Sequence, residues 1–270
     1  MEDLCQHLEW SLLNAAPSFS SFAGLAASLV LASMVIILVE YKGEENPAAA
    51  VAMFTVTLLA LGMDTFIFGA TSGEVLCARG GAQGLLGGST LATGVSILLL
   101  GITLLQAKFK HSHVGLTLLG NVVTSVGALG TMALLALWAA RLVNNLVIVR
   151  LWPAPGISFV PSLVLIGIFL VAIIFVALMG PGRRVREVAI VATTCIYLLH
   201  ILVSFVMYVA TIVIPVVQWT VRTDPVVLIL TIAISIAFPF VELIGVVMSL
   251  DWRGGREFWQ QPASVAADDQ

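Results

Sequence analysis

Three ionisable side chains lie inside long apolar segments of the sequence: Asp64, His200 and Glu242. Asp64 stands in the stretch GMDTFIFG, which contains no basic residue. A charged group at the centre of a membrane-spanning helix costs about 2.5–3.5 kcal/mol on insertion scales, so such residues usually serve a function. Because carboxyl and imidazole groups bind protons and cations, these three residues form the candidate proton or cation site.

The polar residues around His200 recur at helical spacing. Residues 193, 197, 200, 204, 208 and 211 are all polar, at steps of 4, 3, 4, 4 and 3, which keeps them on one face of a helix. Three other segments have similar stripes: Ser89, Thr93, Ser96 and Thr103; Thr117, Asn121, Thr124 and Ser125; and Thr231, Ser235, Glu242 and Ser249. We expect these stripes to face inward. The predicted lining of a polar pathway is Tyr197, Ser204, Tyr208, Ser235 and Asn121.

The positions of the three ionisable residues along their segments predict different depths in a membrane. Asp64 should lie about 7 Å toward the outside of the midplane, His200 near it, and Glu242 about 6 Å toward the cytoplasm, at 1.5 Å per residue. This order suits a relay if the groups face one cavity. In FPFVELIG, Pro239 also leaves the carbonyl group of Ser235 without its usual helical donor, close to Glu242.

Each of these residues also has a purely structural interpretation. Asp64 and Glu242 could be protonated and donate hydrogen bonds that hold helices together, and His200 could be a neutral core residue. Ser and Thr stripes commonly join packed helices, at roughly 0.6–2 kcal/mol per hydrogen bond. The sequence leaves both interpretations open.

The composition places these residues in a membrane protein. Sixty percent of the 270 residues are apolar and only 10% are charged. Seven segments are long and apolar enough to cross a bilayer as helices. They cover residues 19–41, 48–70, 84–106, 114–140, 157–179, 188–217 and 226–250. We therefore predict an all-α membrane protein with a seven-transmembrane-helix bundle at 19–250, an N-terminal segment at 1–18 and a tail at 251–270. The almost wholly apolar fifth segment should face lipid.

The loops predict an orientation, because Lys and Arg are retained on the cytoplasmic side. Eight such residues fall on the face that holds the first, third and fifth loops and the C-terminus, against four on the other face. The N-terminus is therefore expected outside and the C-terminus in the cytoplasm. The preference for Arg over Lys, together with abundant Ala, Gly and Val, favours a bacterial plasma membrane.

This orientation gives the cysteines different expected states. Cys5 and Cys77 both fall outside, where they could form a disulfide or stay unpaired. Cys195 lies in the sixth segment and should be a buried thiol.

Other kinds of chemistry find little support in the sequence. No acid or Cys repeats near His200 at ligand spacing, which argues against a metal or haem site, and we predict no cofactor. G-x-S-x-G and phosphate-loop motifs are missing, and we assign no catalytic residue. The net charge of −3 shows no excess of basic residues, which argues against nucleic acid as a partner.

The sequence favours a small membrane transporter or channel-like protein that moves a proton, cation or small solute. The alternative is a non-catalytic membrane subunit or receptor-like partner, and a membrane-embedded enzyme ranks third. Expected partners are the lipid bilayer, a second copy held through the Gly84 and Gly88 strip, and a protein bound at the cytoplasmic face. The basic sequence GPGRRVRE suits that protein or an anionic lipid.

Overall fold

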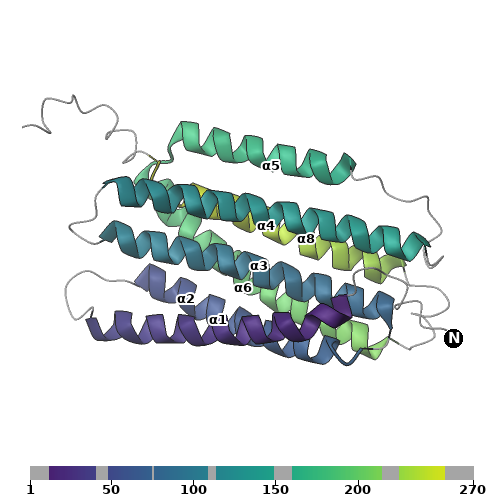
Figure 1. Ribbon diagram of the computed structural model, residues 1–270. Helices are drawn as coiled ribbons and strands as arrows, with labels where there is room; N and C mark the ends of the chain where they lie inside the picture. The colour runs from purple at the N-terminus through teal and green to yellow at the C-terminus, as the bar shows by residue number, and fades with distance from the viewer. Residues whose placement is uncertain are drawn as a thin grey trace, which may run out of the picture.

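A computed structural model describes residues 12–40, 48–74, 76–108, 114–148, 160–214 and 225–252, and these form helices with short connections (Figure 1). The helices are α1 (Leu12–Glu40), α2 (Ala48–Thr71), α3 (Cys77–Lys108), α4 (Val114–Ile148), α5 (Val160–Met179), α6 (Arg183–Val213) and α8 (Pro225–Met248). The described residues contain no strand. All seven helices are long and apolar enough to span a membrane, so the prediction of a seven-helix membrane protein is confirmed at this level.

The observed helices differ from the predicted segments mainly at their ends. α1 begins at Leu12 and α3 at Cys77, both well before the predicted starts at 19 and 84. These added turns contain small and polar residues that hydropathy excludes but a helix tolerates. α6 ends at Val213, before Pro215, whose ring and missing N–H disfavour a longer helix. The predicted boundary at residue 18 therefore falls inside α1.

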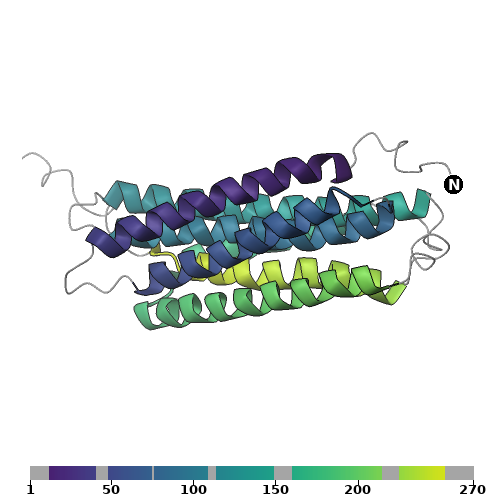
Figure 2. The same ribbon diagram turned by 90° about the horizontal axis from the view of Figure 1, so that it is seen from below.

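α3 occupies the centre of the bundle (Figure 1). It packs against α1, α2, α4, α6 and α8, and it is the most buried of the seven helices. α1 and α5 lie at opposite sides, as the first view shows, and the second view shows α6 and α8 running side by side (Figure 2). On α5 only Ser162 and Phe169 are buried, which agrees with the expectation that this helix faces outward.

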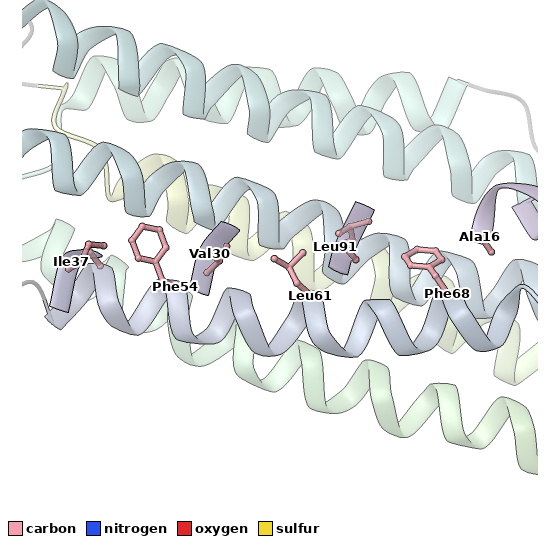
Figure 3. Close-up of a cluster of buried hydrophobic side chains, with 9 residues drawn as sticks. Ala16, Val30, Ile37, Phe54, Leu61, Phe68 and Leu91 are labelled. Carbon is pink, nitrogen blue, oxygen red and sulfur yellow. The ribbon is translucent and has the colours of Figure 1, made fainter. Parts of the chain in front are cut away.

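Apolar side chains fill the space between α1, α2 and α3 (Figure 3). Ala16, Val30 and Ile37 of α1 meet a row of larger side chains on α2, among them Phe54 and Phe68. Burying a side chain of this size contributes about 1.5–3 kcal/mol relative to leaving it in water. Between helices inside a bilayer, close packing takes over that role, because lipid is as apolar as the core.

An ion pair lies at each end of the bundle. At one end, called here the Glu74 end, Arg79 at the start of α3 makes two hydrogen bonds to Glu74, of 2.5 and 2.9 Å. At the opposite Asp251 end, Arg186 of α6 pairs with the Asp251 carboxylate at 2.8 Å. The Asn121 amide of α4 donates to the Asp251 carbonyl group at 2.8 Å. The end of α8 is thereby tied to α4 and α6.

Candidate functional site

His200 of α6 and Glu242 of α8 are in direct contact in the interior. Nδ1 of His200 lies 3.1 Å from Oε2 of Glu242, and both side chains have no accessible surface. Ser89 of α3 reaches the other ring nitrogen, Nε2, at 3.2 Å. Phe238 covers the ring face, with 5.1 Å between centroids and 11° between planes. Three helices therefore hold the imidazole by its two nitrogens and one face.

The hydroxyl group of Ser89 links the protonation of His200 to a choice between two acceptors. It lies 2.8 Å from the Leu86 carbonyl oxygen as well as near Nε2. When Ser89 donates to Leu86, Nε2 must carry a proton and donate to Ser89, because a hydroxyl has only one hydrogen. When Nε2 is bare, Ser89 can donate to it instead. Rotation of this one hydroxyl therefore lets the bond between Ser89 and Nε2 form with either partner as the donor.

Asp64 of α2 belongs to the same polar interior through the next residue of α3. The Thr90 hydroxyl donates to Oδ1 of Asp64 at 2.5 Å, and both side chains are fully buried. Tyr197 of α6 donates its hydroxyl to the Thr90 carbonyl group at 2.9 Å. Gly94 makes this approach possible, since a Cβ there would lie 2.5 Å from the Tyr197 oxygen. The pair Ser89–Thr90 thus joins the surroundings of all three ionisable residues.

Both carboxyl groups keep one oxygen without a hydrogen bond. Oδ2 of Asp64 and Oε1 of Glu242 are buried and have no partner in the described part of the chain. Five buried hydroxyls of the same helices share this condition: those of Thr57, Thr93, Ser204, Thr231 and Ser235. Buried polar atoms are normally satisfied, so a concentration of unsatisfied ones calls for an explanation.

The unsatisfied hydroxyls of α6 and α8 lie on the Glu74 side of the pair. Ser204 lies about 6 Å beyond His200 along α6, and Ser235 and Thr231 lie about 10 and 16 Å before Glu242 along α8, at 1.5 Å per residue. Near the Glu74 end, Gln83 donates to Thr211 at 3.2 Å and accepts from Thr71 at 3.4 Å. Polar groups therefore continue from the pair toward one end of the bundle.

The predicted stripe on α6 is confirmed, because all six of its polar residues are buried. Among the predicted lining residues, Tyr197, Ser204 and Ser235 are buried in the polar interior, and Tyr208 belongs to an apolar cluster with Ile67 and Leu86. Asn121 lies apart, since it bonds to Asp251 at that end of the bundle. No described contact joins it to the His200 group.

His200 and Glu242, predicted to lie about 6 Å apart in depth, are in contact, and their two long side chains can span such a difference. The structure joins His200 directly to Glu242, and the neighbouring residues Ser89 and Thr90 link this pair to Asp64.

Sequence reasoning placed Ser89 in a polar stripe without giving it a partner, and it missed Thr90 altogether. Thr90 lies outside the predicted polar stripe of its helix, which comprises Ser89, Thr93, Ser96 and Thr103. The signal available was the adjacent pair GGST, which places two hydroxyls about 100° apart on one helix.

The expectation for Cys195 was wrong. Its thiol is free and exposed on the outer face of α6, because it lies between stripe positions 193 and 197 but points away from them. The predicted disulfide between Cys5 and Cys77 lies outside the described residues, because Cys5 and the side chain of Cys77 are not among them.

The glycine strip of α3 is used within the chain. Gly84 and Gly88 are buried, and the Trp138 ring of α4 lies directly over Gly88, where a Cβ would collide with it. The face predicted to bind a second copy is therefore covered at Gly88 by α4 of the same chain.

Comparisons with known proteins add no relationship to this geometry. The chain matches no protein-family model, and no curated protein or solved structure resembles it significantly. Among the described residues, no three His, Cys, Asp or Glu side chains converge as a metal site would require.

Proposed function

We propose that the protein is a multi-pass membrane transporter in which His200 and Glu242 bind and release a proton and Asp64 serves as a second acid. The moved species is a proton, or a cation or small solute whose passage is coupled to it. One observation carries the proposal: Ser89 and Thr90 contact His200 and Asp64, His200 bonds to Glu242, and each of the two carboxyl groups keeps an unsatisfied oxygen among the described residues.

Stability alone is a weak reason to bury these groups. Replacing a buried ion pair by well-packed apolar residues is often neutral or stabilising by 1–4 kcal/mol. Ionisable residues are costly within membrane helices, and those that are present commonly mark ion pathways and proton relays. The unsatisfied hydroxyls of Ser204, Ser235 and Thr231 give a protonated pair further acceptors toward the Glu74 end.

The absence of accessible surface at the site favours proton movement in this conformation. His200, Glu242 and Asp64 all have exposures of 0%, so a solute larger than a proton requires the helices to part. Pro239 offers a place for such movement in α8, because Ser235 cannot receive the usual hydrogen bond from residue 239.

We further propose that the Glu74 end faces the outside and the Asp251 end faces the cytoplasm of a bacterium. The excess of Lys and Arg in the loops at the Asp251 end supports this orientation. The hydroxyls beyond His200 then lead toward the outer side.

A second candidate is a non-catalytic subunit of a larger membrane complex. The complete burial of the three ionisable residues and the close contacts at Gly88 and Gly245 favour it, since both are also expected of a rigid helix bundle. The basic start of α6 would then contact a cytoplasmic protein.

Proton flux into liposomes separates the two candidates. Purified protein is reconstituted with a pH-sensitive dye inside the vesicles, and an acid pulse is applied under a membrane potential. Glu242→Gln and Asp64→Asn should each lower flux at least tenfold relative to the wild type. Glu187→Gln, which removes an exposed acid from α6, is the matched control and should leave flux unchanged. If Glu242→Gln and Asp64→Asn both retain the flux of the wild type, the proton-relay proposal is wrong. If the wild-type protein itself shows no flux, the non-catalytic subunit becomes the better candidate.

A further inference from the structure

A groove runs between α6 and α8 near the Asp251 end. Its volume is about 470 Å³. The walls are mostly apolar and include Val188, Ala192 and Ile196 of α6 and Val241, Ile244 and Met248 of α8. Thr193 and Gly245 lie at the base, where a Cβ on Gly245 would collide with the threonine hydroxyl. The close approach of the two helices below and their large side chains above create the groove.

Arg184 lines this groove and differs from the two other arginines of its turn. Arg183 pairs with Glu187 at 2.8 Å, and Arg186 pairs with Asp251 at 2.8 Å. Arg184 is exposed and has no carboxylate partner among the residues that the structure describes. Among the described residues that line the groove, Arg184 therefore supplies the one positive charge, without a described carboxylate to balance it.

The length of the groove corresponds to one leaflet. From Arg184 to Ile196 the axis of α6 advances about 18 Å at 1.5 Å per residue. Half of a bilayer core measures about 15 Å. An acyl chain that lies in the groove therefore reaches the midplane when its headgroup is level with Arg184.

We infer that the α6–α8 groove binds one anionic phospholipid, whose phosphate is held by Arg184 and whose acyl chain lies along the apolar walls. Guanidinium groups bind phosphate through two parallel hydrogen bonds. A water-soluble ligand fits this groove poorly, because Arg184 and the buried Thr193 hydroxyl are the polar side-chain groups in its otherwise apolar lining. A zwitterionic lipid brings its own cation, which competes with Arg184 for the phosphate. This inference is independent of the proposed transport activity.

Native mass spectrometry of the full chain tests the headgroup. Delipidated protein in detergent is titrated with phosphatidylglycerol or with phosphatidylcholine of the same acyl chains. We expect one tightly bound phosphatidylglycerol and weaker phosphatidylcholine. Arg184→Gln should weaken the phosphatidylglycerol site about fivefold, as expected for one basic residue near an anionic lipid. Arg183→Gln removes the same charge from the same turn and should change binding less than twofold. Equal effects of the two variants overturn the assignment to Arg184.

Filling the groove tests the acyl chain. Ala192→Phe places a ring inside it and should remove the bound lipid whatever its headgroup, whereas Val191→Phe adds the same ring to a neighbouring exposed position outside it. A phosphatidylglycerol with a photoactivatable acyl chain should label residues 188–196 and 241–248 in the wild type and lose that labelling in Ala192→Phe. Unchanged stoichiometry in Ala192→Phe, or labelling confined to other helices, overturns the proposal.

Discussion

Thr90 and Thr93 are buried threonines one turn apart on α3, yet only Thr90 bonds to an acid. Thr90→Val should destabilise the protein by about 1–3 kcal/mol, because it leaves both oxygens of Asp64 buried without a partner. Thr93→Val removes a hydroxyl that has no partner and should be neutral or stabilising. Unfolding of detergent-solubilised protein by heat or denaturant measures the difference.

The Asp64→Val background provides the control for this comparison. Because Asp64→Val removes the carboxyl group that Thr90 would satisfy, adding Thr90→Val should lower the free energy of unfolding little more than adding Thr93→Val. Equal losses from the two valine variants in the wild-type background would mean that the bond between Thr90 and Asp64 contributes nothing to stability.

The contact between His200 and Glu242 should appear as a coupling in a double-mutant cycle. Removing one partner, as in His200→Leu or Glu242→Leu, leaves a buried polar group alone and should cost about 3–5 kcal/mol. The double variant should cost at least 1 kcal/mol less than the sum of the two, because it strands no partner. Additive losses in the unfolding free energy would contradict a direct interaction.

At the scale of helices, the crossing of α6 over α8 depends on Gly245. Gly245→Ala places a methyl group against Thr193 and should destabilise the bundle by about 1–3 kcal/mol through overpacking. Thr193→Ala, combined with it, should recover most of that loss. Gly167→Ala on α5 meets no neighbouring atom and should stabilise the protein slightly, by about 0.5–1 kcal/mol. The same unfolding assay compares the three variants. A loss in Gly167→Ala as large as that in Gly245→Ala would assign the effect to helix flexibility in general.

The sequence was sufficient to predict the helices and the buried face of α6, because hydropathy and a repeat of 3.6 residues are local properties. It was insufficient to predict cross-helix partners. The bond from Thr90 to Asp64 depends on the rotation of α3 against α2, and the contact of Glu242 with His200 depends on the position of α8 along α6. Cys195 illustrates the same limit, since two positions along a helix change a buried residue into an exposed one.

At the scale of the whole molecule, the orientation can be tested by labelling from one side. In a variant without the three native cysteines, Ser72→Cys marks the Glu74 end and Gly182→Cys marks the Asp251 end. A membrane-impermeant maleimide added to intact cells should label residue 72, and residue 182 only after the cells are opened. The reverse labelling pattern would place the Glu74 end in the cytoplasm and would contradict the proposed orientation of the bundle in the membrane.

Ser89 and Thr90 are consecutive in α3 but contact different groups about 100° apart around the helix: Ser89 contacts the His200–Glu242 pair, and Thr90 contacts Asp64. A rotation of α3 about its own axis moves both hydroxyls at once, so the helix couples two centres, the His200–Glu242 pair and Asp64. Under the proposed function, the two centres then change state in one step. The dependence of flux on proton concentration should have a Hill coefficient near two, and Thr90→Val should lower it toward one.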